Sequence, residues 1–353
     1  MLASTSRWAD TLQRAWLSRG VVSCVLAPLA FLMGVVVCTR ATLYRRGALR
    51  THRLPVPVVV VGNLVAGGAG KTPTVIAVLA LLREQGHTPG VISRGYGRRT
   101  DDVQEVRADS SVHDSGDEPL LLRLRCGVPV VVGRDRVAAG RHLLGLHPDV
   151  SIIVSDDGLQ HLRLARDAQV VVFDERGAGN GWMLPAGPLR EPMSHLAPPR
   201  SVVVYNAAQA TTAWSGASAH SSLAGLVRLA DWWAGRPASQ HSLIALRKRP
   251  VTAAAGLARP ERFFNMLRQA GLQVTALPLP DHHDFATLPW PAGTEDVVVT
   301  EKDAVKLKTE RAGDPRVWVA PLNFELDQAS RIALLALLGP ALTQRTAHGY
   351  PIA

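Results

Sequence analysis

The chain is poor in cysteine, and this scarcity excludes a fold held by a network of disulfides and a fold held by zinc. Its 353 residues include only Cys24, Cys38 and Cys126. Three cysteines at these distances form neither a disulfide framework nor a zinc-binding pattern. Aromatic residues make up 5% and charged residues 19%, whereas apolar residues reach 47%. This composition is typical of a folded protein, and the length accommodates two α/β domains. The cysteine usage indicates that any catalytic part is cytosolic.

Acidic residues are outnumbered by basic ones. The chain has 39 lysines and arginines, mostly arginine, against 29 acids, which gives a net charge of +10. Such an excess suits nucleic acid, anionic lipid or phosphorylated substrates. Zinc-finger spacing and RNA-binding aromatic motifs are missing from the sequence, so nucleic acid is not expected as a partner.

One long stretch near the start contains no charged residue. It covers residues 20–39, and a helix over it would be about 30 Å long, close to the thickness of a bilayer core. Five arginines and no acid follow within a short distance: Arg40, Arg45, Arg46, Arg50 and Arg53. This bias favours a membrane-anchoring helix with its C-terminal side in the cytoplasm. A signal peptide is disfavoured because it would export the rest of the chain. A buried helix, or one that lies in the membrane interface, stays open as an alternative, because Pro28 and Gly34 weaken a simple span.

A glycine-rich turn follows the apolar run Val58–Val61. Backbone N–H groups at glycines can turn toward an anion, and the following helix adds the positive end of its dipole. Lys71 can reach the β- and γ-phosphates, and the Thr72 hydroxyl can bind Mg²⁺. The strict P-loop pattern has glycine where this chain has Val65, so an ordinary αβ turn is the alternative. We expect a nucleoside triphosphate to bind at these residues: Gly67, Gly68, Ala69, Gly70, Lys71 and Thr72.

Two adjacent carboxylates, Asp156 and Asp157, close the apolar run Ser151–Ser155. In P-loop enzymes an acid at the end of a neighbouring strand holds the hydrated Mg²⁺. An Asp-Gly turn after a strand is the alternative. Together with the P-loop, the pair favours a magnesium site that includes Thr72.

Several polar motifs allow a structural and a chemical interpretation. Asp117, before an apolar helix, can cap that helix. Arg94 stands in a Gly-rich turn that can approach an anion or form a solvated surface. The stretch 281–285 can relay protons, bind a metal or form a polar loop. The stretch 300–306 most simply begins a helix with ion pairs along its side.

Apolar β-branched runs alternate with helix-sized gaps, a pattern typical of a parallel sheet covered by helices. The fold class predicted is therefore α/β: a P-loop NTPase-like parallel-sheet domain, a second smaller α/β domain and an N-terminal membrane helix. The predicted strands are Val56–Val61, Val91–Ser93, Val128–Val132, Ser151–Ser155, Val170–Phe173, Ser201–Tyr205, Leu243–Leu246, Val251–Ala255, Val274–Leu277, Val297–Thr300 and Val317–Val319. The expected divisions are an N-terminal segment 1–19, the helix 20–39, a kinase domain 40–176, a linker or active-site loop 177–199 and a second domain 200–353.

The motifs taken together resemble the lipid A 4'-kinase family, the tetraacyldisaccharide 4'-kinases. The resemblance rests on eight segments in order: 62–73, 93–97, 116–119, 156–161, 184–192, 255–263, 281–283 and 300–306. It implies transfer of the γ-phosphate of ATP to the 4'-hydroxyl of a tetraacyl glucosamine disaccharide 1-phosphate, which gives lipid IVA. It also implies work at the bacterial inner membrane, on its cytoplasmic face, without an obligate protein partner.

The resemblance also implies roles for individual residues. Asp117 and His282 correspond to the family's catalytic pair, with the P-loop and Asp117 on one lobe and His282 on the other. Asp156 and Asp157 would bind Mg²⁺ and help to position the phosphates, together with the catalytic Lys71. Weaker candidates for substrate contacts are Arg94, His161, Arg190 and Glu191.

Two other functions are compatible with the P-loop and the anchor alone. A nucleotide-dependent switch would hydrolyse ATP or GTP slowly and bind a protein partner. A transport or scaffold component would use the glycine-rich turn without binding nucleotide. Neither alternative needs the motifs at 156–158 and 281–283, and formation of a phosphorylated lipid would distinguish the kinase from both.

Overall fold

The structure is a computed structural model that describes residues 14–311, 313 and 315–346. The chain forms two compact units, each built from separated stretches of sequence. Unit 1 contains the chain up to Arg94, Gly133–His220 and the chain from Glu325 onward, and unit 2 contains Gly95–Val132 and Ser221–Phe324. The chain therefore enters unit 2 twice and returns to unit 1 each time.

Unit 1 is built on a parallel sheet with the strand order β2-β5-β1-β6-β7-β8. The strands are β1 (Val58–Gly62), β2 (Pro89–Ser93), β5 (Ile152–Asp156), β6 (Ala168–Asp174), β7 (Ser201–Asn206) and β8 (Ala217–Ser218). All five residues of β1 are buried, as expected for a β-branched strand inside a parallel sheet. Because β1 and β5 run in parallel, the glycine-rich turn and the two aspartates leave the sheet at the same edge.

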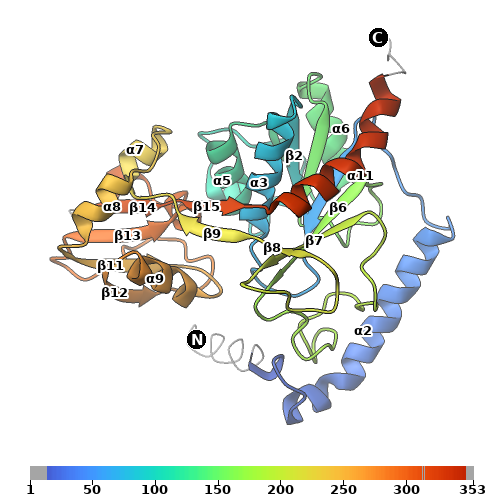
Figure 1. Cartoon of the computed structure of the whole chain (residues 1–353), viewed down its shortest axis with the longest axis horizontal. Helices are drawn as coiled ribbons and strands as arrows, with labels where there is room; N and C mark the ends of the chain where they lie inside the picture. The colour runs from blue at the N-terminus through green and yellow to red at the C-terminus, as the bar shows by residue number, and fades with distance from the viewer. Residues whose placement is uncertain (1–13, 312, 314, 347–353) are drawn as a thin grey trace. The chain divides into compact units, whose positions relative to one another are not determined.

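Helices cover this sheet (Figure 1). Packed against it are α3 (Lys71–Glu84) on β1 and β5, α6 (Arg136–Leu146) on β2, and α11 (Gln328–Thr346) on β6 and β7. The buried residues of α3 include Val75, Val78, Leu79 and Leu82, which recur at the helical period. One apolar face therefore holds α3 on the sheet directly behind the glycine-rich turn.

The helix α2 (Val21–Arg45) corresponds to the predicted anchor. It is the one helix in the described part of the chain that is long and apolar enough to cross a membrane by length and composition. Its large apolar side chains are exposed, with Val21 at 80%, Val25 at 71% and Phe31 at 73%. An exposed apolar surface of this kind is typical of a helix that contacts a membrane or another protein.

The N-terminal end of α2 is attached to the loop that follows residue 179. The side-chain amide of Asn180 donates to the carbonyl of Ser18 (3.1 Å), to the Ser23 hydroxyl (3.2 Å) and to the carbonyl of Ala186 (2.9 Å). Trp16 Nε1 donates to the carbonyl of Pro185 over 2.9 Å. These bonds fix the start of α2 to the rest of unit 1.

Unit 2 contains a mixed sheet with the strand order β10-β14-β13-β11-β12, in which β10 alone of these strands is antiparallel to its neighbour. Its strands are β10 (Val227–Arg228), β11 (Pro250–Ala255), β12 (Gln273–Pro278), β13 (Asp296–Thr300) and β14 (Arg316–Ala320). β3 (Gln104–Glu105) pairs antiparallel with β4 (Val130–Val132). β9 (His220–Leu223) and β15 (Leu322–Glu325) form a separate two-stranded sheet. Its helices are α4 (Val112–Ser115), α5 (Asp117–Cys126), α7 (Leu229–Trp233), α8 (Gln240–Leu246), α9 (Pro260–Gln269), α10 (Glu301–Ala304) and the 3₁₀ turn η1 (Thr309–Arg311).

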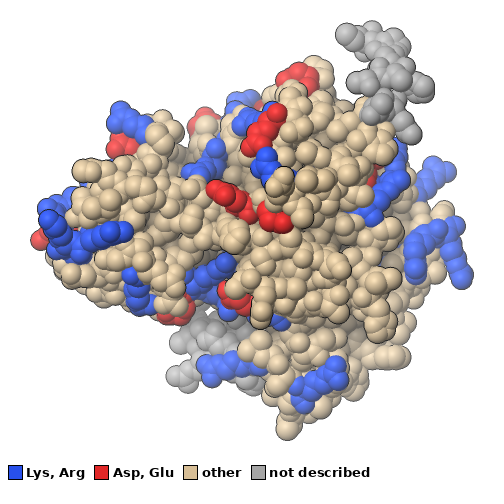
Figure 2. Space-filling model, viewed as in Figure 1, with Lys and Arg blue, Asp and Glu red and all other residues tan. Residues whose placement is uncertain are grey.

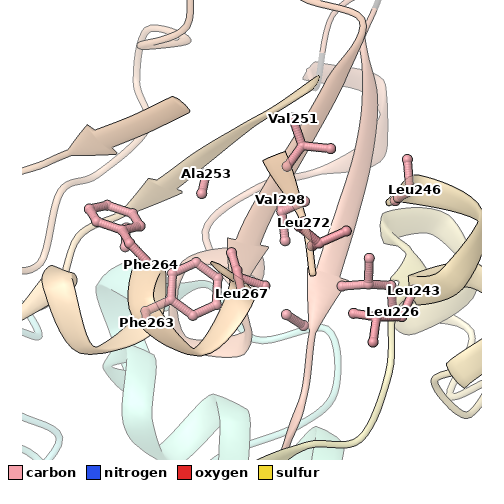
Figure 3. Packing of buried hydrophobic residues seen from close by; sticks show 12 residues of the cluster. Leu226, Leu243, Leu246, Val251, Ala253, Phe263, Phe264, Leu267, Leu272 and Val298 are labelled. Carbon is pink, nitrogen blue, oxygen red and sulfur yellow. The ribbon is translucent and has the colours of Figure 1, made fainter. Parts of the chain in front are cut away.

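The core of unit 2 lies between α8, α9 and the sheet (Figure 3). Phe263, Phe264 and Leu267 of α9 point toward β11, where Val251 and Ala253 are buried. Proline at the first position of α9 suits a helix start, because its missing N–H would have no partner within the helix. This packing fixes β11, whose carboxyl end leads toward the polar residues of unit 2.

The predicted α/β class with parallel sheets is confirmed, and most predicted strands occur near their expected positions. The prediction of a strand at Leu243–Leu246 is wrong, because these residues belong to α8. Leu243 and Leu246 are buried three residues apart while Ile244 is 52% exposed, which is helical spacing. The hydroxyl of Ser239 caps this helix by accepting from the N–H of His241.

The division of the chain also differs from the expected boundaries at 40–176 and 200–353. Residues 95–132 belong to unit 2, and β7, β8 and α11 belong to unit 1. Residues 177–199 lie within unit 1 and do not link the units. A linear division misses this arrangement because each unit is assembled from segments far apart in sequence. Residues 1–13 of the predicted N-terminal segment lie outside the described residues.

Replacement of Phe264 by alanine tests the core of unit 2. Phe264 is completely buried in the α9 face, so Phe264→Ala is expected to destabilise unit 2 by about 3–5 kcal/mol through lost burial and the cavity left behind. Urea unfolding monitored by fluorescence would measure the change. The control Ile244→Ala, at a half-exposed site in the same unit, is expected to cost less than about 1 kcal/mol. Equal losses for the two variants would contradict this description of the core.

Candidate active site

The turn between β1 and α3 has the backbone that its glycines predict. Gly67 and Gly70 adopt φ values of 93° and 91°, in the left-handed region that side chains with a Cβ disfavour. A Cβ at Gly70 would also collide with the side chain of Asn206, and one at Gly67 would lie 3.2 Å from Arg176 Nη1. Gly70 is the N-cap of α3, so the turn ends at the positive end of that helix dipole.

The carbonyl groups of the turn are held by side chains of unit 1. Asn63 Nδ2 donates to the carbonyl of Gly67 over 3.2 Å. Arg176 donates to the carbonyls of Ala66 and Gly68 over 3.3 and 3.1 Å. Asn206 donates to the carbonyl of Ala69 over 3.3 Å. In a trans peptide the N–H points opposite to the carbonyl, so the amides of residues 67–70 are directed to the other side, as a phosphate cradle requires.

Val65 explains the departure from the strict P-loop pattern. It is completely buried and forms a bridge with Leu189, while the N–H of Ala66 donates to the carbonyl of Pro188 over 2.7 Å. The N–H of Arg190 donates in turn to the carbonyl of Leu64, also over 2.7 Å. The chain before the glycines is therefore extended and paired, and an apolar residue suits this position better than glycine.

Three predicted residues of unit 1 lie together. Lys71 Nζ is 3.3 Å from Asn63 Oδ1 and 3.7 Å from Asp157 Oδ2. Arg190 Nη1 donates to both carboxylate oxygens of Asp157, over 2.9 and 3.1 Å. Asp157 has a positive φ of 48°, which turns its side chain away from the line of β5. Lysine, carboxylate and arginine thus meet at the carboxyl edge of the sheet.

Asp156 occupies a different environment from its neighbour. It is the last residue of β5, is buried, and accepts a hydrogen bond from the Ser93 hydroxyl over 3.0 Å. Thr72 is the second residue of α3, directly after Lys71. The described residues contain no group of three or more His, Cys, Asp or Glu side chains suited to a metal. A magnesium site here would therefore also use hydroxyl, phosphate and water oxygens, as is usual for this ion.

The weaker substrate candidates are distributed unevenly. Glu191 accepts from Gln160 over 2.9 Å, and the same Gln160 amide lies 3.4 Å from the carbonyl of Asn63. Glu191 is thereby connected to the chain that precedes the cradle. His161 lies instead beside Asp135, with 3.9 Å between Nε2 and Oδ1. Arg94 is exposed after β2, and within the described ranges no contact joins it to the Lys71 group.

A second group of predicted residues lies in unit 2. His282 Nδ1 is 2.8 Å from Asp117 Oδ2, although 164 residues separate them along the chain. Asp117 begins α5 and is 4% exposed, and its Oδ1 accepts from the N–H of Glu118 over 2.9 Å. His282 has a positive φ of 59°. The helix-cap interpretation of Asp117 is therefore incomplete, because the second oxygen is directed to the histidine.

The ionisation of Asp117 reflects two opposed effects. Burial raises the pKa of the carboxyl, because a charged group loses hydration. The hydrogen bond with His282 and the positive charges of Lys302 and Lys306 outweigh burial, and the pKa lies below its ordinary value. Asp117 is therefore an ionised hydrogen-bond acceptor at neutral pH.

Sequence reasoning missed the two lysines of this group. It correctly placed a helix start at Thr300, whose hydroxyl accepts from the N–H of Asp303, but gave Lys302 and Lys306 no place near Asp117. Their ammonium groups lie 3.9 and 3.7 Å from Asp117 Oδ2. The available signal was a pair of lysines four residues apart just after a buried strand. The expectation that Asp117 and His282 lie on opposite lobes is wrong, because both belong to unit 2.

Comparisons with known proteins agree with these features. The family model described as tetraacyldisaccharide-1-P 4'-kinase (LpxK) matches residues 22–339. The chain belongs to this family. It is 55% identical to the tetraacyldisaccharide 4'-kinase of Leptothrix cholodnii, over 96% of this chain and 98% of that protein. It is also 55% identical to the same-named protein of Methylibium petroleiphilum, over 95% of each chain.

A solved structure extends the likeness to the fold. The crystal structure of LpxK from Aquifex aeolicus in complex with ATP has a TM-score of 0.75 to this chain and 26% sequence identity. The match covers 91% of this chain and 100% of that one. Membership of the family confirms the predicted resemblance, the α/β fold class and the assignment as a kinase.

The environment of His161 predicts a pH dependence of stability. Burial, together with the charge of nearby Arg136, lowers the pKa of His161 to about 4. As the pH falls below about 6.5 the unfolded chain gains a proton that the folded chain rejects, so stability declines from pH 6.5 toward pH 4. When the pH is lowered from about 7.5 to about 5, we expect the melting temperature of His161→Gln to fall less than that of the unmodified protein.

Differential scanning fluorimetry at the two pH values measures this effect. His142→Gln, at an exposed site on α6, is the matched control and should behave like the unmodified protein. If His161→Gln and the unmodified protein show the same pH dependence, His161 is not held neutral by the fold.

Proposed function

We propose that this protein transfers the γ-phosphate of ATP to the 4'-hydroxyl of a tetraacyl glucosamine disaccharide 1-phosphate, with lipid IVA as the product. The observation that carries the proposal is the glycine cradle of residues 67–70, followed by Lys71, in a chain of the 4'-kinase family. The solved relative was crystallised with ATP, which supports ATP as the phosphate donor. The paired Asp117 and His282 suit activation of an alcohol acceptor.

The residues of unit 1 suit the nucleotide and its metal ion. Amide groups of the cradle and the ammonium of Lys71 would bind the phosphate oxygens. Thr72, Asp156 and Asp157 would hold Mg²⁺ directly or through water, and the ion would neutralise charge on the phosphates. Arg190, held against Asp157, adds a positive charge at the same edge. Phosphoryl transfer depends mainly on such positioning and electrostatic stabilisation.

The residues of unit 2 suit the acceptor alcohol. A sugar hydroxyl is a weak nucleophile, and an ionised carboxylate can accept its proton as it attacks. Asp117 is ionised at neutral pH, and its Oδ2 is the oxygen that faces His282. His282 would orient this oxygen and stabilise the charge before transfer. The alcohol would pass its proton to Asp117 as its oxygen bonds to the γ-phosphorus, while the bond from that phosphorus to the β,γ-bridging oxygen breaks and ADP leaves.

The exposed helix α2 suits an acceptor that stays in a bilayer. We propose that α2 anchors the enzyme to the bacterial inner membrane, spanning it or lying in its interface, with both units on the cytoplasmic side. The visible surface along α2 is mainly uncharged, and basic side chains gather near its C-terminal end (Figure 2). The basic residues of this part of the chain are Arg40, Arg45, Arg46, Arg50 and Arg53. They would attract anionic headgroups and the 1-phosphate of the substrate.

The test is direct. Purified protein in detergent is incubated with ATP, Mg²⁺ and the tetraacyl disaccharide 1-phosphate, and the lipid products are separated and weighed by mass spectrometry. A product heavier by one phosphoryl group supports the proposal. Hydrolysis of ATP without a phosphorylated lipid would instead favour a nucleotide-dependent switch.

Loss of the Lys71 ammonium should be severe. Lys71→Ala is expected to lower kcat by about a hundredfold or more, because a charged donor near the transferred phosphate is removed. The same lipid assay measures the rate, and circular dichroism checks the fold. Lys248→Ala, an exposed lysine in unit 2, is the control and should retain full activity. Normal turnover by Lys71→Ala would remove Lys71 from the phosphate site.

Loss of the Asp117 charge should affect the chemical step more than nucleotide binding. Asp117→Asn keeps the size of the side chain but removes the proton acceptor, so kcat should fall by about a hundredfold or more with little change in KM for ATP. Steady-state kinetics at varied ATP separate the two effects. Asp109→Asn, at an exposed site in unit 2, is the control. A variant with normal kcat and a lower melting temperature would restore a purely structural role for Asp117.

A further inference from the structure

The segment after β13 places two lysines on the Asp117–His282 pair, and the proposed reaction does not use them. Lys302 belongs to α10 and Lys306 follows one turn later, so both lie on the same side of the segment. In a chain whose basic residues are mostly arginine, lysine occurs at few positions. Both ammonium groups approach one atom, Asp117 Oδ2, which also faces His282 Nδ1.

Lys306 is held in place by a buried carboxylate. Its side chain is 4% exposed, and Nζ lies 3.3 Å from Asp303 Oδ1. The other oxygen of Asp303 accepts from the Thr300 hydroxyl over 2.7 Å and from the N–H of Gly256 over 3.1 Å. Asp303 is completely buried, so its charge is compensated by these donors and by Lys306. The position of the ammonium beside Asp117 is thus fixed by the fold.

The same network reaches the backbone of the histidine. The carbonyl of Gly256 accepts from the N–H of His282 over 3.3 Å, while the N–H of Gly256 donates to Asp303. His282 has a left-handed backbone that costs free energy unless its surroundings hold it. The ring of Tyr96 also lies near the histidine, with 5.5 Å between the centroids of the two rings. Asp303 therefore fixes the Lys306 side chain and the loop that carries His282 at the same time.

Lys302 lies on the other nitrogen of the histidine. Its Nζ is 3.5 Å from His282 Nε2, 3.2 Å from Glu118 Oε1 and 3.8 Å from Asp281 Oδ1. An ammonium group can only donate hydrogen bonds, so this neighbour favours a lone pair on Nε2. The ring proton then belongs on Nδ1, which donates to Asp117. Burial lowers the pKa of Lys302, but the carboxylates of Glu118 and Asp117 raise it to about 12, so it stays charged.

We propose that Lys302 and Lys306 are positioning residues of the kinase reaction, which hold Asp117 ionised and oriented and direct the His282 ring proton toward it. The inference rests on the proposed function, because it assigns Asp117 as the proton acceptor. The carboxylate is buried, and burial alone would favour its protonated form, which cannot accept a proton. Two fixed cations offset that cost.

The pH dependence of kcat tests this role. Asp117 acts only when ionised, so activity is lost as the pH falls through its pKa. Removal of the Lys306 charge raises this pKa, and Lys306→Gln should move the acid limb of the kcat profile upward by about one pH unit. Lys302→Gln should move it in the same direction. Lys306→Arg keeps the charge and should keep the limb near its original position, even if its larger side chain lowers kcat.

The controls separate charge from folding. Lys308→Gln removes an exposed lysine two residues further on and should leave the profile unchanged. Melting temperatures and KM for ATP identify variants that misfold. If Lys306→Gln does not fold, Lys302→Gln decides the matter, because its side chain is 17% exposed and better tolerates replacement.

Two failures are distinguishable in this experiment. One outcome is that the unmodified protein phosphorylates the lipid while the acid limb of the kcat profile lies at the same pH in the lysine variants. In that case the positioning role is overturned and the proposed function stands. If the unmodified protein forms no phosphorylated lipid, the proposed function is overturned, and the inference falls with it.

Discussion

The backbone of Gly67–Gly70 can face a phosphate only because its carbonyl groups are held on the opposite side. Asn63, Arg176 and Asn206 supply the donors, and each comes from a strand end or a loop of unit 1. Glycine is required at two positions because the backbone there is left-handed and a Cβ would meet these same side chains. Hence the cradle is a property of the whole parallel sheet and not of the glycine-rich segment alone.

The group of residues around Asp117 and His282 in unit 2 depends on compensation of charge. Asp117 is buried, yet its pKa lies below the ordinary value, because the hydrogen bond with His282 and the nearby positive charges outweigh burial. Lys302 and Lys306 supply the remaining charge, and Asp303 fixes the second of them. In the proposed reaction Asp117 must be ionised before it can accept a proton, so the groups that keep it ionised belong to the proposed site.

The loop of residues 180–190 contacts both the start of α2 and the group formed by Lys71 and Asp157 in unit 1. Asn180 binds the start of α2, and Arg190 binds Asp157 beside Lys71. Between them the loop pairs with the strand that leads into the cradle. The start of α2 is thus connected to the Lys71–Asp157–Arg190 group through hydrogen bonds within one unit. If α2 anchors the protein as proposed, this connection would limit the positions that the proposed nucleotide site can take.

The sequence alone determined what depends on local pattern. The apolar strands, the glycine-rich turn and the long uncharged helix were sufficient to predict the α/β class. The order of the motifs indicated the family, and the pairing of Asp117 with His282 was implied by that resemblance and not by local pattern. The helical period of Leu243 and Leu246 was misread, since a four-residue apolar run suits a helix as well as a strand. Only the tertiary structure decided the division into units and the approach of Lys302 and Lys306 to one carboxylate oxygen. Both depend on contacts between segments far apart in sequence, and such contacts leave no periodic signal along the chain.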